Sequence, residues 1–140
     1  MDVIEADLPK LAEKIAAVVE PGDIIALSGP LGAGKTALTR EVLRAMGENN
    51  VVSSPTFVLE HRYPVNWRGI KTVLHLDLYR LSEKDLPQFD WAEYLEADHQ
   101  LTIIEWPEIA QKYLPNHTKT VKIEVIDAKT RRFQLPGALA

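Results

Sequence analysis

The sequence contains no cysteine. It therefore has no disulfide framework and no cysteine-based zinc site, and this composition fits a reducing compartment. No apolar stretch approaches the ~20 residues of a membrane-spanning helix, and residues 1–5 are acidic, unlike the start of a signal peptide. From these absences we expect a cytoplasmic protein with no membrane association.

An excess of positive charge is also missing. The formal net charge is −4, whereas a protein that binds nucleic acid by itself usually presents a basic surface. We therefore expect a protein partner rather than DNA or direct contact with RNA. The chain has 140 residues, of which 46% are hydrophobic. This is enough for the core of one domain, residues 1–140, and too little for two.

A phosphate-binding motif lies in the first third of the chain. Residues 29–36, Gly-Pro-Leu-Gly-Ala-Gly-Lys-Thr, follow the P-loop pattern G-x-x-x-x-G-K-[ST]. The glycines allow the backbone to curl so that successive N–H groups point at phosphate oxygens. Lys35 is expected to reach the β- and γ-phosphates, and Thr36 to bind Mg²⁺ through its hydroxyl. The motif predicts nucleotide contacts at Leu31, Gly32, Ala33, Gly34, Lys35 and Thr36.

The segments on both sides of the motif fit the strand–loop–helix order that a P-loop requires. Residues 23–28 are a short and largely apolar run, as a buried parallel strand should be. Apolar residues then recur at helical spacing from Leu38 to Met46, and Gly47 follows as a C-cap. Because both flanks agree with the motif, we predict a nucleoside-triphosphate site here.

The rest of the pattern predicts helices and strands that alternate early, with hairpins later. A helix is expected from Leu8 to Val19, with Asp7 as its N-cap. The other expected elements are strands at residues 57–63 and 72–78 joined by a loop around residues 64–69, a short helix at 91–95, a buried strand at 100–106, a helical turn at 109–113, and strands at 120–125 and 131–135. We predict an α/β fold, a P-loop NTPase-type sandwich whose mostly parallel central sheet has antiparallel hairpins at its edges.

Two acidic residues end apolar strands and are candidates for the second half of the site. Asp77 ends the strand at 72–78, and Glu105 ends the strand at 100–106. The second strand has the apolar pattern of a central strand, whereas His75 in the first predicts a less buried face. We therefore expect Glu105 to bind Mg²⁺ and Asp77 to orient water or support the metal ligands.

Two further positions are open to more than one interpretation. Residues 54–56, Ser-Pro-Thr, place the Thr56 hydroxyl where many such enzymes sense the γ-phosphate, but an ordinary Ser-Pro turn explains them equally well. Trp106 follows Glu105 directly. A tryptophan there is usually part of the core, and at the end of the strand it can instead support the acid or face a partner.

These segments together resemble the TsaE (YjeE) family, small bacterial ATPases required to form threonylcarbamoyladenosine in tRNA. The matching pieces are the P-loop, residues 54–57 (Ser-Pro-Thr-Phe), residues 75–80 (His-Leu-Asp-Leu-Tyr-Arg) and residues 103–108 (Ile-Ile-Glu-Trp-Pro-Glu). The P-loop is shared by a vast superfamily. The other pieces are far more specific, and together the segments span nearly the whole chain.

The resemblance implies a nucleotide site with named residues. It implies ATP or ADP in the glycine loop, Mg²⁺ on Thr36 and Glu105, and Asp77 needed for hydrolysis. It also implies a mobile segment at Thr56 and a functionally sensitive Trp106. It places Glu5 and Arg131 near the adenosine moiety. The implied partner is the complex of the family's TsaB and TsaD proteins, with tRNA involved only indirectly.

This chain departs from the family pattern at two positions. Pro30 stands where the family usually has Asp or Glu, and Ala37 stands where it often has a second hydroxyl residue. Pro30 removes a charge and an N–H group at the edge of the loop. Ala37 loses a hydrogen bond to the α-phosphate, on the order of 1 kcal/mol for a neutral bond. Both departures predict weaker nucleotide binding without a change of chemistry.

The expected reaction is hydrolysis of ATP to ADP and phosphate. No arginine finger is recognised in the sequence, so we expect a slow ATPase that a partner completes or orders. No Asn/Thr-Lys-x-Asp guanine reader is present, which favours ATP over GTP. The alternatives are a small nucleoside or nucleotide kinase, although residues 81–88 lack a lid arginine, and a nucleotide-switched binding module with incidental turnover.

Overall fold

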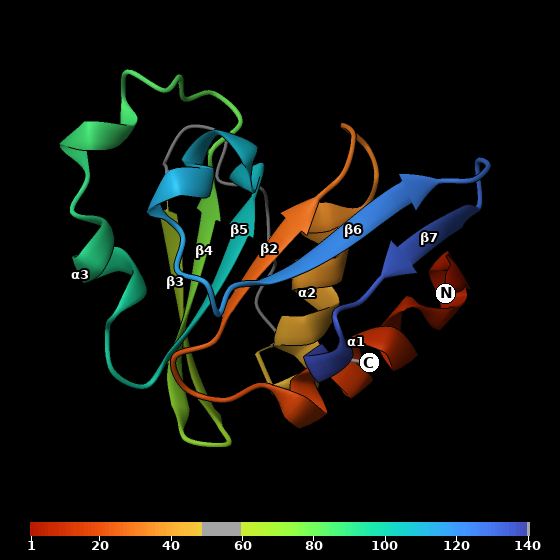
Figure 1. Ribbon diagram of the computed structural model, residues 1–140. Helices are drawn as coiled ribbons and strands as arrows, with labels where there is room; N and C mark the ends of the chain where they lie inside the picture. Colours follow the sequence, from red (N-terminus) through yellow and green to blue (C-terminus); the bar gives the residue numbers. More distant parts are fainter. Residues whose placement is uncertain (49–59, 140) are drawn as a thin grey trace.

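A seven-stranded mixed sheet forms the centre of the protein (Figure 1). The computed structural model describes residues 1–48 and 60–139. Its elements in chain order are β1 (Asp2–Ile4), η1 (Glu5–Asp7), α1 (Leu8–Val18), β2 (Ile24–Ser28), α2 (Lys35–Ala45), β3 (Glu60–Trp67), β4 (Ile70–Asp77), η2 (Leu86–Gln88), α3 (Trp91–Leu95), β5 (Gln100–Glu105), η3 (Pro107–Tyr113), β6 (Lys119–Val125), β7 (Thr130–Gln134) and η4 (Gly137–Leu139). Within these described residues, no helix is long and apolar enough to span a bilayer.

The strand directions confirm the predicted fold class. The order is β1-β7-β6-β2-β5-β4-β3. The central strands β6, β2, β5 and β4 pair in parallel, whereas β3, β7 and β1 join as antiparallel edge strands. Strand β5 is buried at all six positions. This burial on both faces explains why its sequence is a nearly continuous apolar run rather than an alternating one.

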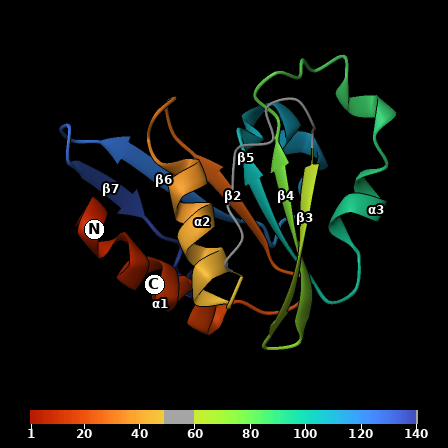
Figure 2. The ribbon, with the colours of Figure 1, turned by 180° about the vertical axis from the view of Figure 1, so that it is seen from behind.

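Helices cover both faces of the sheet, so the protein has three layers. Figure 2 shows α1 and α2 lying across one face, and α3 belongs to the opposite face. Alternate residues of each strand divide between two apolar clusters because side chains alternate along a strand. In β4, Val73 packs on the α1–α2 side and Leu74 packs on the side of α3.

The carboxyl ends of the parallel strands meet at one edge of the sheet. Ser28 ends β2, Asp77 ends β4 and Glu105 ends β5. Glu105 pairs in register with Leu27 on one side and with Asp77 on the other. The loop that carries the P-loop sequence leaves β2 at this same edge, so the predicted acids and the predicted phosphate loop lie together.

The predicted hairpin loop at residues 64–69 is wrong. Strand β3 runs through Pro64 to Trp67, and the turn is only Arg68-Gly69, with φ of 51° and 85°. Pro64 is tolerated because β3 is an edge strand, where a missing N–H costs no ladder bond. The register of the pair is irregular between Pro64 and Trp67. Residues 57–59, the expected start of this strand, lie outside the described residues.

The N-terminal segment also differs from the expectation. Residues Asp2–Ile4 form β1, which was not predicted, and pair with β7. Asp7 does not cap α1 through its side chain, because a 3₁₀ turn precedes the helix and Asp7 has φ −98° and ψ −3° rather than an extended conformation. The C-terminus of α2 is as predicted. Gly47 has φ 91°, and Glu48 N–H donates to Leu43 O at 2.9 Å.

Gly29 is the position at which the loop passes closest to the sheet. A Cβ atom on Gly29 would lie 2.7 Å from Ile123 O and 3.2 Å from Ile123 Cβ. Substitution Gly29→Ala should therefore destabilise the protein by about 1–3 kcal/mol through overpacking. Urea unfolding measures this loss. Gly137→Ala is the matched control because nothing lies within 4 Å of its added Cβ, and equal stability of the two variants would contradict the prediction.

Candidate functional site

The loop between β2 and α2 presents backbone amides at the start of a helix. Gly34, which precedes α2, has φ 103°, a backbone conformation that residues other than glycine rarely adopt. The loop is closed by a hydrogen bond from Ala33 N–H to Pro30 O at 3.0 Å. The first residues of α2 are Lys35 and Thr36, so both side chains start where the positive end of the helix dipole lies. This arrangement suits an anion.

The Lys35 ammonium group is held by its own loop. Its Nζ donates to Gly29 O at 2.5 Å and to Pro30 O at 3.2 Å. Its Nζ also lies 3.6 Å from the centre of the Trp106 ring, and the residue is only 5% exposed. Burial lowers the pKa of Lys35 below its ordinary value of 10.5, and the charges of Glu105, Glu108 and Asp77 act in the opposite direction.

Thr36 and Glu105 form a pair of oxygen donors. Thr36 Oγ1 lies 3.1 Å from both Oε1 and Oε2 of Glu105, which is 3% exposed. Hydroxyl and carboxylate oxygens are the ligands that Mg²⁺ prefers, and Mg²⁺ usually takes one or two protein ligands together with phosphates and water. The described residues contain no group of three or more His, Asp or Glu that could hold a metal alone. The donor set therefore fits a nucleotide-bound Mg²⁺ rather than a free-standing metal site.

His75 was expected to mark a less buried strand face, and this is wrong. His75 is 0% exposed. Its Nε2 lies 2.5 Å from Glu105 Oε2, so the buried polar ring has a buried polar partner. A lone histidine in an apolar strand gives no sequence signal for its partner. The parallel register of β4 and β5, which brings the two side chains together, becomes known only from the structure.

Asp77 lies beside Glu105 at the edge of the sheet. The two residues are paired in the register of β4 and β5. Asp77 Oδ1 accepts a hydrogen bond from Tyr79 N–H at 2.9 Å, which fixes one carboxylate oxygen against the following turn. Asp77 is only partly buried. It therefore lies near the phosphate loop with access to solvent, as a residue that orients water requires.

Trp106 contacts Lys35 of the phosphate loop and also packs, partly buried, against the apolar cluster on the α3 side of the sheet. It has φ 58°, an uncommon left-handed conformation for a large side chain, and it directly precedes η3. Its ring centre lies 3.6 Å from Lys35 Nζ and 4.9 Å from the ring centre of Tyr79. Of the interpretations open from the sequence, packing against the core is observed, and the polar contact of the ring is with Lys35 rather than with the acid Glu105.

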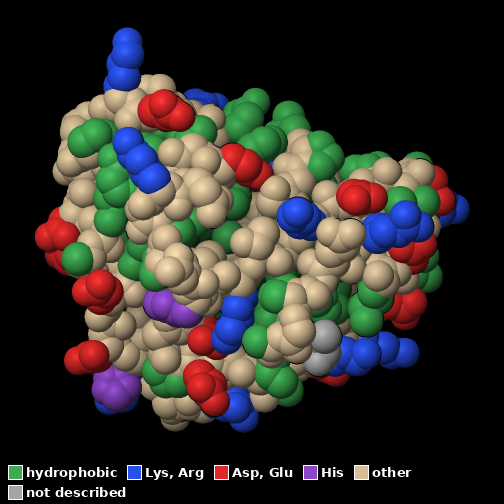
Figure 3. All heavy atoms as spheres, viewed as in Figure 1, with side chains coloured by type: hydrophobic (Ala, Val, Ile, Leu, Met, Phe, Trp, Pro, Cys, Tyr) green, Lys and Arg blue, Asp and Glu red, His purple; other side chains and the backbone are tan. Residues whose placement is uncertain are grey.

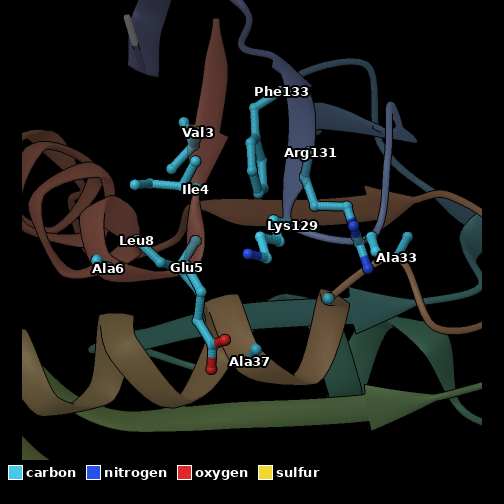
Figure 4. A pocket seen from close by; sticks show the side chains of 12 residues that line it. Val3, Ile4, Glu5, Ala6, Leu8, Ala33, Ala37, Lys129, Arg131 and Phe133 are labelled. Carbon is cyan, nitrogen blue, oxygen red and sulfur yellow. The ribbon is translucent and has the colours of Figure 1, made fainter.

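A pocket of about 640 Å³ adjoins the phosphate loop. Glu5 and Arg131 both line it, together with Ala33, Gly34 and Ala37. Figure 4 shows Glu5 reaching toward Ala37 of α2, and Arg131 reaching from β7 toward Ala33. Arg131 Nη2 also approaches Gly32 O at 3.4 Å.

The pocket is mostly apolar. Its other lining residues are Val3, Ile4, Ala6, Leu8, Ala128, Lys129 and Phe133. An apolar pocket with a few polar groups at its rim has the character of a small-molecule site.

The structure thus brings most predicted residues into two adjoining places. Four of them lie at the edge of the sheet: Lys35, Thr36, Asp77 and Glu105. Five others line the pocket: Ala33, Gly34, Ala37, Glu5 and Arg131. Leu31 is 72% exposed. Thr56 and the segment 54–57 lie outside the described residues. Besides His75, the sequence also gave no sign that Glu108 Oε1 accepts a hydrogen bond from Ser28, at 2.6 Å, at the entry to the loop.

The fold and the loop define the class first: an α/β protein with a P-loop sequence at the carboxyl edge of a mixed sheet. The chain matches the family described as "Threonylcarbamoyl adenosine biosynthesis protein TsaE" over residues 4–133. It belongs to the TsaE family.

Relatives agree with this membership. The tRNA threonylcarbamoyladenosine biosynthesis protein TsaE of Rickettsia felis is 38% identical over 129 residues, which are 91% of this chain and 72% of that protein. The protein of the same name from Bacillus subtilis is 31% identical over 114 residues, 81% of this chain and 69% of that one. The crystal structure of Bacillus subtilis YdiB has the same fold, with a TM-score of 0.77 and 24% identity, and the match covers 95% of this chain and 80% of that one.

The lowered pKa of Lys35 predicts a pH effect on stability. The unfolded chain holds the Lys35 proton up to about pH 10.5, whereas the folded protein releases it at lower pH. Between these pKa values the unfolded state binds more protons, so the stability of the wild type should rise with pH relative to Lys35→Met. Urea unfolding at pH 7.5 and pH 10 measures the change. Lys14→Met, on the exposed side of α1, corrects for the loss of one positive charge, and a difference independent of pH would contradict the assignment.

Proposed function

We propose that this protein hydrolyses ATP to ADP and phosphate in a Mg²⁺-dependent reaction that serves threonylcarbamoyladenosine formation in tRNA. Membership of the TsaE family supports the place in tRNA modification. The observation that carries the proposed chemistry is the meeting of Thr36 Oγ1 and the Glu105 carboxylate, 3.1 Å apart, beside Lys35 at the end of the phosphate loop.

The position of the pocket next to the loop supports a nucleotide that spans both. The adenosine moiety would occupy the apolar pocket between Glu5 and Arg131, and the phosphates would follow the loop amides toward Lys35. Lys35 Nζ, which donates to the carbonyls of Gly29 and Pro30, would meet the phosphates at that end of the loop. Ala37 lines the pocket without a hydroxyl, which supports the expectation of weaker binding to the α-phosphate.

Thr36 and Glu105 would hold the cation. Bound there, Mg²⁺ would offset negative charge on the transferring phosphoryl group. The loop amides and Lys35 would act on the same charge, and the burial of Lys35 and Glu105 would make their electrostatic interactions stronger than in water. Asp77, and the Thr56 hydroxyl that the family resemblance implicates, would orient the attacking water.

A protein partner would account for the arginine finger that the sequence does not show. With no arginine finger recognised in the sequence, the isolated chain should turn over slowly. We propose that the partner is the TsaB–TsaD complex implied by the family resemblance, that tRNA is engaged only through it, and that the protein works in the cytoplasm. The face drawn in Figure 3 mixes acidic and basic side chains rather than presenting one basic patch, which agrees with the net charge of −4.

The ATPase rate with and without the purified TsaB–TsaD complex tests the proposal. We expect slow phosphate release from the chain alone, a faster rate with the complex, and none from Lys35→Ala, because the ammonium group would no longer contact the β- and γ-phosphates. Normal turnover by Lys35→Ala would contradict the assigned site. Transfer of the phosphoryl group to a nucleoside instead of water would indicate a kinase.

Glu105→Ala should weaken nucleotide binding only where Mg²⁺ is present. The variant keeps the loop amides and Lys35 but loses the carboxylate ligand. Titration calorimetry of ADP with Mg²⁺ and with a chelator measures the contribution of the metal. Glu13→Ala, an exposed acid on α1, is the control. Unchanged Mg²⁺-dependent affinity in Glu105→Ala would refute this placement of the metal.

A further inference from the structure

His75 is a buried polar side chain with a single described polar contact. It lies in β4 between Leu74 and Leu76 and is 0% exposed. Its Nε2 lies 2.5 Å from Glu105 Oε2, and among the described residues its Nδ1 has no hydrogen-bond partner. Burying a polar nitrogen without a partner is costly. An apolar side chain would fill this place in the sheet without that cost, so packing alone does not account for His75.

The register of the sheet explains why His75 meets Glu105. His75 is paired with Ile103 on β5, and Glu105 lies two residues further along that strand. Because side chains alternate along a strand, residues 103 and 105 share one face. The imidazole therefore reaches diagonally along the sheet to the carboxylate. On its other side His75 is paired with His61 of β3, whose Nδ1 lies 3.1 Å from Tyr63 Oη.

Because of this contact, the two carboxylate oxygens of Glu105 have different neighbours. An ionised carboxylate can only accept, so a hydrogen bond to it requires an Nε2–H donor on His75. Oε2 is then held by the imidazole as well as by Thr36, whereas Oε1 has Thr36 Oγ1 as its neighbour at 3.1 Å. The carboxylate is fixed from the core side by the ring and from the loop side by the hydroxyl.

We propose that His75 is a positioning residue that orients Glu105 for the cation that accompanies the nucleotide. This inference rests on the proposed Mg²⁺-dependent function. His75 does not touch the nucleotide or the metal. It holds the carboxylate so that Oε1 and the Thr36 hydroxyl face the phosphate loop together. Mutation of a group that holds a metal ligand in this way typically lowers metal affinity about 10- to 100-fold.

Two substitutions separate positioning from packing. His75→Leu removes the donor and keeps an apolar side chain, whereas His75→Gln keeps an N–H donor of similar reach. Titration calorimetry gives the affinity for ADP with Mg²⁺ and with a chelator. We expect His75→Leu to lose about 10- to 100-fold of the Mg²⁺-dependent gain, with affinity in chelator unchanged, and His75→Gln to restore most of the gain.

The outcomes distinguish this inference from the proposed function. If the wild type binds more tightly with Mg²⁺ and His75→Leu gains equally, His75 has no positioning role and the proposed function stands. Equal loss with and without Mg²⁺ in His75→Leu would show that the ring only maintains the fold. Absence of any Mg²⁺ effect in the wild type would refute the proposed function and this inference with it.

A measurement on the wild type keeps the inference testable if His75→Leu does not fold. Nitrogen-15 NMR of the histidine rings should show one protected Nε2–H resonance, identified by its absence in His75→Gln. We expect this resonance to shift when Mg²⁺ and ADP are added together and to stay in place with ADP and chelator. A resonance that ignores Mg²⁺ would overturn the proposal.

Discussion

The buried carboxylate of Glu105 joins the sheet to the phosphate loop. It is 3% exposed, and it contacts His75 from the neighbouring strand and Thr36 from the helix after the loop. A charge in this position is costly unless hydrogen bonds offset the lost hydration. The three side chains come from β5, β4 and α2, so their contact forms only when the parallel register and the loop are both correct. The register of the sheet and the position of the phosphate loop therefore meet in this one cluster.

The Lys35 ammonium group is held within the phosphate loop. It donates to two carbonyls of the loop and lies against the Trp106 ring, where a cation is attracted to the π-face. Burial disfavours the charged form of Lys35. A phosphate bound beside it would favour that charged form. The Lys35 ammonium group and Trp106, which has φ 58°, are in contact at the end of the phosphate loop.

The sequence predicted features that depend on neighbouring residues, and it did not predict contacts between residues far apart in the chain. The P-loop pattern, the apolar run of β5 and the C-cap Gly47 all act within a few residues, so each was predicted correctly. The three-residue strand β1 is too short for any periodicity. Pro64 predicted a loop because proline usually interrupts a strand, whereas β3 tolerates it at the edge of the sheet. His75 looked like a sign of exposure because its partner, Glu105, lies 30 residues away in the sequence.

The mixed sheet explains why the candidate site has two parts with different chemistry. Parallel strands end together, so the centre of the sheet gathers Asp77 and Glu105 beside the loop. The antiparallel strands β1 and β7 instead bring the N-terminal segment next to a later hairpin, and this edge builds the apolar pocket with Glu5 and Arg131. The approach of Arg131 to Gly32 O connects the parts. A ligand that filled both would need an apolar ring system and a chain of negative charges in a fixed order, and a nucleoside triphosphate has that order.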